Sequence, residues 1–73
     1  MYSRARGHLT HVQEQRFRLA TADGPNVLLT LAHDAPLDGA DLQRMLDERA
    51  DIVVEYEGEP GLASGVAHAI RRS

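Results

Sequence analysis

The residues best suited to chemistry in this chain are arginines, because all eight of its basic residues are arginine and none is lysine. Arg16 and Arg18 alternate with Phe17 and Leu19, so in a strand both guanidinium groups project from one face. The planar guanidinium matches the geometry of phosphate oxygens. The pair therefore indicates an anion-binding face, although the absence of lysine also fits the codon bias of a GC-rich genome.

The other arginines lie mostly at the two ends of the sequence. Arg4 and Arg6 precede the first turn, and Arg71 and Arg72 close the chain. Residues 19–61 hold most of the acids, and the net charge of the whole chain is -3. We expect all four to assist Arg16 and Arg18 in binding a polyanion.

An alternative for Arg4 and Arg6 is internal pairing. If the strand that holds them lies beside a strand through Glu55 and Glu57, the arginines can form cross-strand ion pairs with these acids. Exposed pairs of this kind are common and weak.

Histidines and acids give no pattern typical of a metal site or of catalysis. His8 and His11 are three apart and should face opposite sides of a regular strand, and His33 and His68 stand alone. The absence of cysteine removes thiolate ligands and nucleophiles. Helix capping and a solvated helix face explain four acids, Asp38, Asp41, Asp47 and Glu48. We therefore expect no enzyme activity, no metal and no cofactor.

Length and composition indicate one small domain over residues 1–73, with an ordered core at about 4–70. No apolar run reaches the ~20 residues that a membrane helix needs. The basic N-terminus has no apolar stretch behind it, so it does not resemble a signal peptide. We expect a soluble, cytoplasmic protein with no membrane partner.

Three strands are expected before the middle of the chain, over residues 4–13, 16–21 and 27–31. In the first, Leu9 and Val12 are three apart, so a bulge is needed to place both on one face, and Gly7 offers a flexible point upstream. The second and third alternate clearly and are joined by a turn at residues 22–26.

A helix is expected from Asp38 to Arg49, because Asp38 suits the N-cap and Leu42, Met45 and Leu46 form an apolar stripe. Residues 51–57 alternate as a strand, and residues 58–61 form a turn. Residues 62–70 fit either a strand or a helix. We favour a strand, because a helix there would leave the preceding strand without a partner.

With these elements placed, the chain resembles the OB fold, a five-stranded Greek-key barrel with a helix between its third and fourth strands. The resemblance covers residues 4–70 and rests on element order and the bent first strand. The segments Gly7-His8-Leu9-Thr10-His11-Val12 and Gly65-Val66-Ala67 also resemble small bacterial domains of this type. The predicted fold class is thus all-β, an OB-like barrel in the order β-β-β-α-β-β.

The resemblance implies a ligand face on the second and third strands. That face would hold Arg16, Arg18, Leu28 and Thr30, next to Arg4 and Arg6 on the first strand. Its rims would be residues 13–15 and 58–61. Single-stranded DNA or RNA is the ligand that such a face most often binds.

The positions of the aromatic residues weaken the argument for a nucleic-acid ligand. Phe17 and Tyr56 fall on the inward side of their strands, and Tyr2 lies in a terminus that we expect to fray. No ring is left on which a base could stack. We therefore predict a binding module for single-stranded nucleic acid or another polyanion. The alternative is a protein-interaction domain, with Leu28 and Val53 as outward apolar residues.

Overall fold

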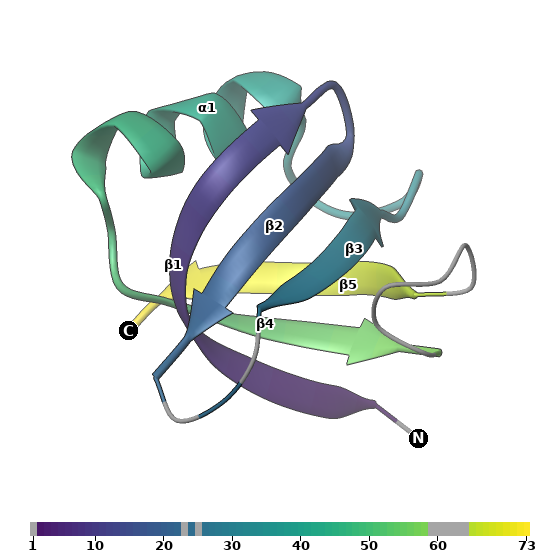
Figure 1. Cartoon of the computed structure of the whole chain (residues 1–73). Helices are drawn as coiled ribbons and strands as arrows, with labels where there is room; N and C mark the ends of the chain where they lie inside the picture. The colour runs from purple at the N-terminus through teal and green to yellow at the C-terminus, as the bar shows by residue number, and fades with distance from the viewer. Residues whose placement is uncertain (1, 23, 25, 59–64) are drawn as a thin grey trace.

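The computed structural model describes residues 2–22, 24, 26–58 and 65–73. Within them five strands and one helix follow one another along the chain (Figure 1). The elements are β1 (Ser3–Gln13), β2 (Arg16–Thr21), β3 (Val27–Leu31), α1 (Gly39–Glu48), β4 (Ile52–Glu57) and β5 (Val66–Arg72). This is the predicted order, and each predicted boundary outside the last strand lies within one residue of the observed one.

The strands close into a barrel in the spatial order β1-β2-β3-β5-β4, with β4 returning to β1. All neighbours are antiparallel except β3 and β5, which run parallel. The helix joins β3 to β4 and lies across one end of the barrel (Figure 1). The predicted fold class, a five-stranded barrel with one helix, is therefore confirmed, and the arrangement is compatible with an OB-like barrel.

Alternation along the strands places one side-chain row inside the barrel. The inward-facing side chains of the strands and of the helix form the core. Among the described residues, ten apolar residues are buried in it: Leu9, Phe17, Leu19, Leu29, Leu31, Leu42, Ile52, Val54, Ala67 and Ile70. Phe17 is fully buried, as predicted. Tyr56 was expected in the core but is only half-buried against its edge, because a bulge between Glu55 and Tyr56 distorts the β4–β5 pairing there.

The first strand pairs with two neighbours within the one closed sheet. Its first half pairs with β4 and its second half with β2, and Gly7 pairs with both, opposite Ile52 and Thr21 (Figure 1). The chain must bend sharply where it changes partner. A Cβ on Gly7 would lie 1.9 Å from the carbonyl oxygen of Ala20, so only glycine fits this close approach.

The predicted bulge in β1 is present. The pairing with β2 slips between Leu9, which lies opposite Leu19, and His11, which lies opposite Arg18. Thr10 is the extra residue, and its exposed side chain reaches the carbonyl oxygen of Arg18. The slip brings Val12 opposite buried Phe17 and against the core. It thus removes the conflict between Leu9 and Val12.

The ambiguous C-terminal segment is a strand. β5 pairs with β4 and closes the barrel against β3, which confirms the predicted strand over residues 66–70 and extends it to Arg72. The first part of the predicted strand, residues 62–64, lies outside the described residues.

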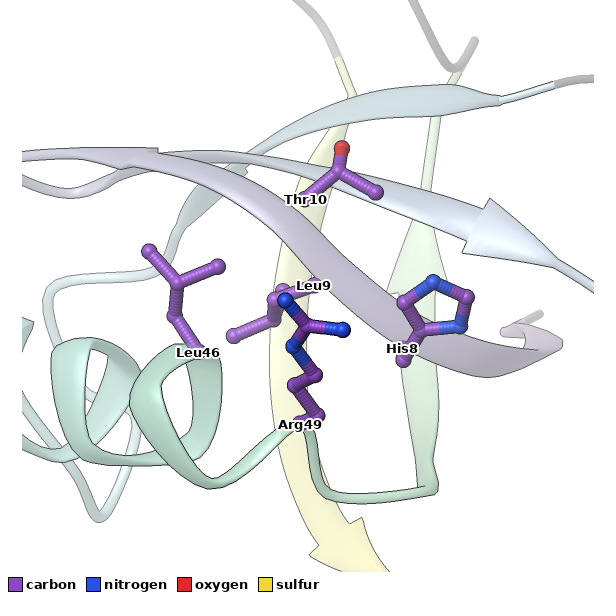
Figure 2. Close-up of a pocket in the computed structure, with 5 residues that line it drawn as sticks. All are labelled: His8, Leu9, Thr10, Leu46 and Arg49. Carbon is purple, nitrogen blue, oxygen red and sulfur yellow. The ribbon is translucent and has the colours of Figure 1, made fainter.

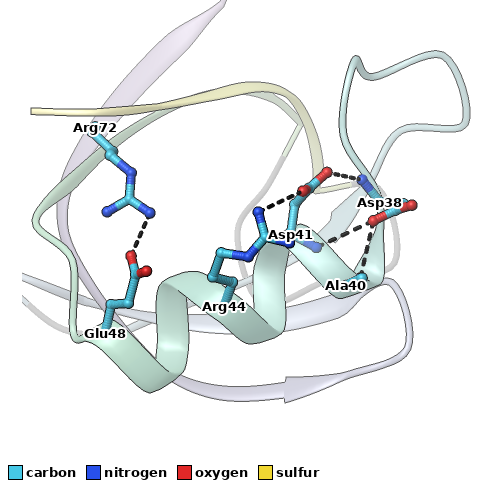
Figure 3. Close-up of polar contacts among 6 residues, drawn as sticks. All are labelled: Asp38, Ala40, Asp41, Arg44, Glu48 and Arg72. Carbon is cyan, nitrogen blue, oxygen red and sulfur yellow. Dashed lines mark hydrogen bonds and ion pairs between the residues drawn. The ribbon is translucent and has the colours of Figure 1, made fainter.

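The helix begins with a capping box (Figure 3). The Asp38 carboxylate accepts hydrogen bonds from the backbone N–H groups of Ala40 and Asp41, at 3.0 and 3.1 Å. In return, the Asp41 carboxylate accepts one from the backbone N–H of Asp38 at 3.1 Å. The predicted N-cap is confirmed. At the other end Arg49 caps the helix in the left-handed conformation, and Leu42 anchors the helix in the core.

Candidate functional site

The outer surface of β1, β2 and β3 forms one continuous basic face. Cross-strand register sets two rows of side chains on it. Arg16 lies between Gln13 and Thr30, and Arg18 lies between His11 and Leu28. We call this set the arginine face: His11, Gln13, Arg16, Arg18, Leu28 and Thr30. All six are exposed except Thr30, which is half-buried.

The two arginines of this face have no acidic partner among the described residues, although other arginines do. Arg6 pairs with Asp51 at 2.9 Å between Nη2 and Oδ2. Arg44 lies 3.9 Å from Asp41, and Arg72 donates a hydrogen bond to Glu48 (Figure 3). Within the arginine face itself no residue is acidic. Arg16 and Arg18 therefore keep their full charge for an external anion.

Arg4 and Arg6, which we expected to assist Arg16 and Arg18 from the neighbouring strand, lie outside these two rows. They lie on the first half of β1, where the neighbouring strand is β4, before the bend at Gly7. Of the two C-terminal arginines, Arg72 is paired with Glu48 and Arg71 lies opposite Val53 on β4.

The alternative prediction, that the arginines form internal ion pairs, is correct for Arg6, but the predicted partner is wrong. Arg6 binds Asp51, because it lies opposite Val53 and Asp51 is two residues from Val53, on the same side of the sheet. Arg4 does lie opposite Glu55, yet no ion pair joins them. The acid predicted for the second pair, Glu57, contacts His68 instead.

Sequence reasoning missed His11 as a member of the face and placed Gln13 only on its rim. A regular strand would put His11 on the side opposite His8, whereas the bulge at Thr10 gives both an outward position beside β2, opposite Arg18 and Ala20. The sequence did contain a signal for the position of His11, because the spacing of Leu9 and Val12 already required a bulge in this strand. No three potential metal ligands cluster within the described part of the chain.

The rims of the face are described only in part. The β1–β2 turn at Glu14 and Gln15 is ordered, and Glu14 takes a left-handed conformation with φ of 58°. Of the second predicted rim only Gly58 lies within the described residues.

An aromatic contact occurs at the N-terminus, where fraying was expected. The ring of Tyr2 stacks on His68 of β5 with centroids 4.7 Å apart, and His68 forms a 3.1 Å hydrogen bond with Glu57. Tyr2 is thus held against the sheet and is not frayed, although 53% of its surface is exposed. It lies beside β4 and β5, so it adds no ring to the arginine face.

The apolar residues proposed for a docking surface are not equivalent. Leu28 is exposed at 40% and lies within the arginine face. Val53 lies on β4, between Arg6 on β1 and Arg71 on β5, and is half-buried. The two do not form one patch, because they belong to different parts of the barrel.

Comparison with known proteins adds no relative to this picture. The chain matches no protein-family model, no curated protein and no solved structure at a significant level. No helix of the described segments is long and apolar enough to cross a membrane. The arginine face therefore has to be interpreted from its own geometry.

Proposed function

We propose that this chain is a non-catalytic binding module whose arginine face binds single-stranded nucleic acid or another polyanion. An OB-type relationship, a bacterial origin and a cytoplasmic location belong to the same proposal. The observation that carries it is that two arginines without acidic partners lie side by side on one strand. Arg16 and Arg18 share one face of β2 and pair with no acid of the described chain, whereas Arg6 and Arg72 pair with Asp51 and Glu48. Arg4, Arg49 and Arg71 also lack an acidic partner among the described residues, but they lie on three other elements.

The neighbours of the two arginines suit a flexible, charged strand. Gln13 and Thr30 offer hydrogen-bond donors to phosphate or base edges on either side of Arg16. His11 beside Arg18 supplies a ring on which a base can stack, and a guanidinium plane serves the same purpose. The face thus combines charge with stacking surface even though it carries no Phe, Tyr or Trp.

The test is fluorescence anisotropy with labelled mixed-sequence single-stranded DNA and RNA at low salt. We expect binding that weakens with salt, because each neutralised phosphate releases counterions. The variant R16Q/R18Q should lose about tenfold or more in affinity for each arginine. Its plot of log affinity against log salt should also be shallower by about 1.4, from two fewer phosphate contacts.

A matched control removes the same charge elsewhere. R4Q/R71Q deletes two exposed arginines that lie away from the arginine face and have no ion pair with another described residue. It should weaken binding only slightly. Absence of binding to both nucleic acids at low salt would sink the proposal, and so would equal losses in the two double variants.

Exposed Leu28 favours a second candidate function, a protein-interaction surface, because it places an apolar side chain at the β3 edge of the same face. Arg16 and Arg18 would then lie beside an apolar contact, an arrangement in which arginine is common at protein interfaces. The substitution L28S should abolish partner binding under this alternative. It should change the affinity for oligonucleotides little, because Leu28 carries no charge.

A further inference from the structure

A second cationic site borders the arginine face, where the end of α1 meets β1. A hollow of about 270 Å³ is lined there by His8, Leu9, Thr10, Leu46 and Arg49 (Figure 2). Leu9 is buried and Leu46 half-buried, so they form an apolar floor. His8, Thr10 and Arg49 are exposed and supply its polar groups. None of the five lining residues is an acid.

The backbone of Arg49 is unusual. It caps α1 with φ of 52° and ψ of 42°, the left-handed conformation that is strained for a residue with a Cβ and that glycine adopts freely. Strained residues of this kind cluster at functional sites. Here the left-handed turn directs the guanidinium back over the hollow and toward His8 (Figure 2).

Arg49 also has no acidic partner among the described residues. Its neighbours in sequence include Glu48 and Asp51, but each of these acids is already bound to a distant arginine. Glu48 accepts from Arg72, and Asp51 accepts from Arg6. The charge of Arg49 is therefore available to an anion that enters the hollow.

The helix end opposes an anion only weakly. A helix C-terminus carries partial negative charge on its last carbonyl groups. Here the backbone N–H of Arg49 bonds to the carbonyl of Leu46 at 3.1 Å, and that of Ala50 bonds to Met45 at 3.1 Å. These two bonds satisfy carbonyl oxygens that would otherwise point at the solvent.

We propose that this hollow binds one phosphate-type oxyanion, with Arg49 as the charged, forked donor. The Thr10 hydroxyl and the ring N–H of His8 are the other donors. The contact of Thr10 Oγ1 with the carbonyl of Arg18 is 3.5 Å long, so the hydroxyl is free to turn to a better acceptor. The oxyanion can come from free phosphate or from the backbone of a nucleic acid. The inference does not depend on the arginine face.

The test is titration of the ¹⁵N-labelled full chain with inorganic phosphate, with sodium chloride of equal ionic strength as the reference. We expect saturable shifts at His8, Thr10 and the Arg49 Nε–H. In the variant R49G the shifts at His8 and Thr10 should vanish, although its unfolding temperature should rise by about 4–8 °C through relief of the left-handed strain. Loss of binding with a gain in stability separates function from misfolding.

Two controls make the result specific. R44Q removes an exposed arginine of the same helix that lies beside Asp41 and does not line the hollow, so it should keep the phosphate shifts. R49K keeps the charge but loses the fork, and should bind severalfold more weakly. Unchanged shifts in R49G would overturn the proposal. So would the absence of any shift with either inorganic phosphate or an oligonucleotide.

The source of the oxyanion follows from two further arms. Shifts with inorganic phosphate that persist in R16Q/R18Q identify a free phosphate site, whatever becomes of the arginine face. Shifts that occur only with an oligonucleotide, and that R49G removes, place a backbone phosphate in the hollow. Both results support the site. Because the phosphate titration does not use the arginine face, failure of this site can be told apart from failure of the proposed function.

Discussion

At the scale of single residues, Gly7 has the least freedom to vary. It is the point where β1 leaves β4 for β2, and a side chain there would overlap the backbone of Ala20. We predict that Gly7→Ala destabilises the protein by at least about 3 kcal/mol, because a clash with backbone cannot be relieved by rotating a side chain. For so small a domain that loss approaches complete unfolding.

Urea unfolding followed by circular dichroism measures this effect, and Gly24→Ala is its control. A Cβ on Gly24 would meet only the Thr21 side chain, at 3.5 Å, which is an ordinary contact. Its stability should stay within about 0.5 kcal/mol of the parent. Similar losses in both variants would mean that the close approach at Gly7 is unimportant.

The sequence predicted which residues face inward better than it predicted which residues pair. Phe17, Leu19 and Leu29 follow a period of two within short strands, so local spacing is enough to assign them. The Arg6–Asp51 pair, in contrast, joins residues that are 45 apart in the sequence. The outward position of His11 results from a bulge in the pairing of β1 with β2, so it also depends on a second strand. Such contacts depend on barrel register, which local patterns do not contain.

At the scale of elements, α1 depends on its first turn. Asp38 satisfies two backbone N–H groups at the end of the helix, and no basic residue supports the last turn. We predict that Asp38→Ala lowers the free energy of unfolding by about 1 kcal/mol, whereas Asp38→Asn, which keeps the accepting oxygen, costs much less. Thermal unfolding of both variants measures the difference.

Asp47→Ala is the matched control for that prediction. Asp47 is also an exposed helical aspartate, but it lies in the last turn, where negative charge is unfavourable to the helix dipole. Its removal gives up only the hydrogen bond from Gln43. The protein should be unchanged or slightly more stable. A loss equal to that of Asp38→Ala would indicate a general effect of charge and not of capping.

Elements were more predictable than the contacts between them. The N-cap at Asp38, the apolar stripe of α1 and the alternation of β4 each lie within a dozen residues. The last strand was decided by topology, since β4 needs a neighbour and β5 supplies it. The candidate site was harder to predict from the sequence, because its residues come from three strands. They become neighbours only when the strands pair in the observed register.

At the scale of the whole molecule, the barrel has one weak seam. Most neighbouring strands are antiparallel, but β3 and β5 are parallel and, among the described residues, share two register pairs, Thr30 with Val66 and Leu31 with Ala67. Parallel pairing is slightly less stable per residue, and a short ladder opens more easily than a long one. Opening of the barrel should therefore begin between β3 and β5.

Native-state hydrogen exchange tests this along one strand. The Thr30 and Ala32 amides donate across the seam, to the carbonyls of Gly65 and Ala67, at 3.0 and 2.8 Å. The amide between them, on Leu31, donates to the opposite side, to Gln15 at 2.7 Å. We predict faster exchange at residues 30 and 32 than at residue 31. Equal protection of the three would mean that the barrel opens only as a unit, because a local separation of β3 from β5 must spare Leu31.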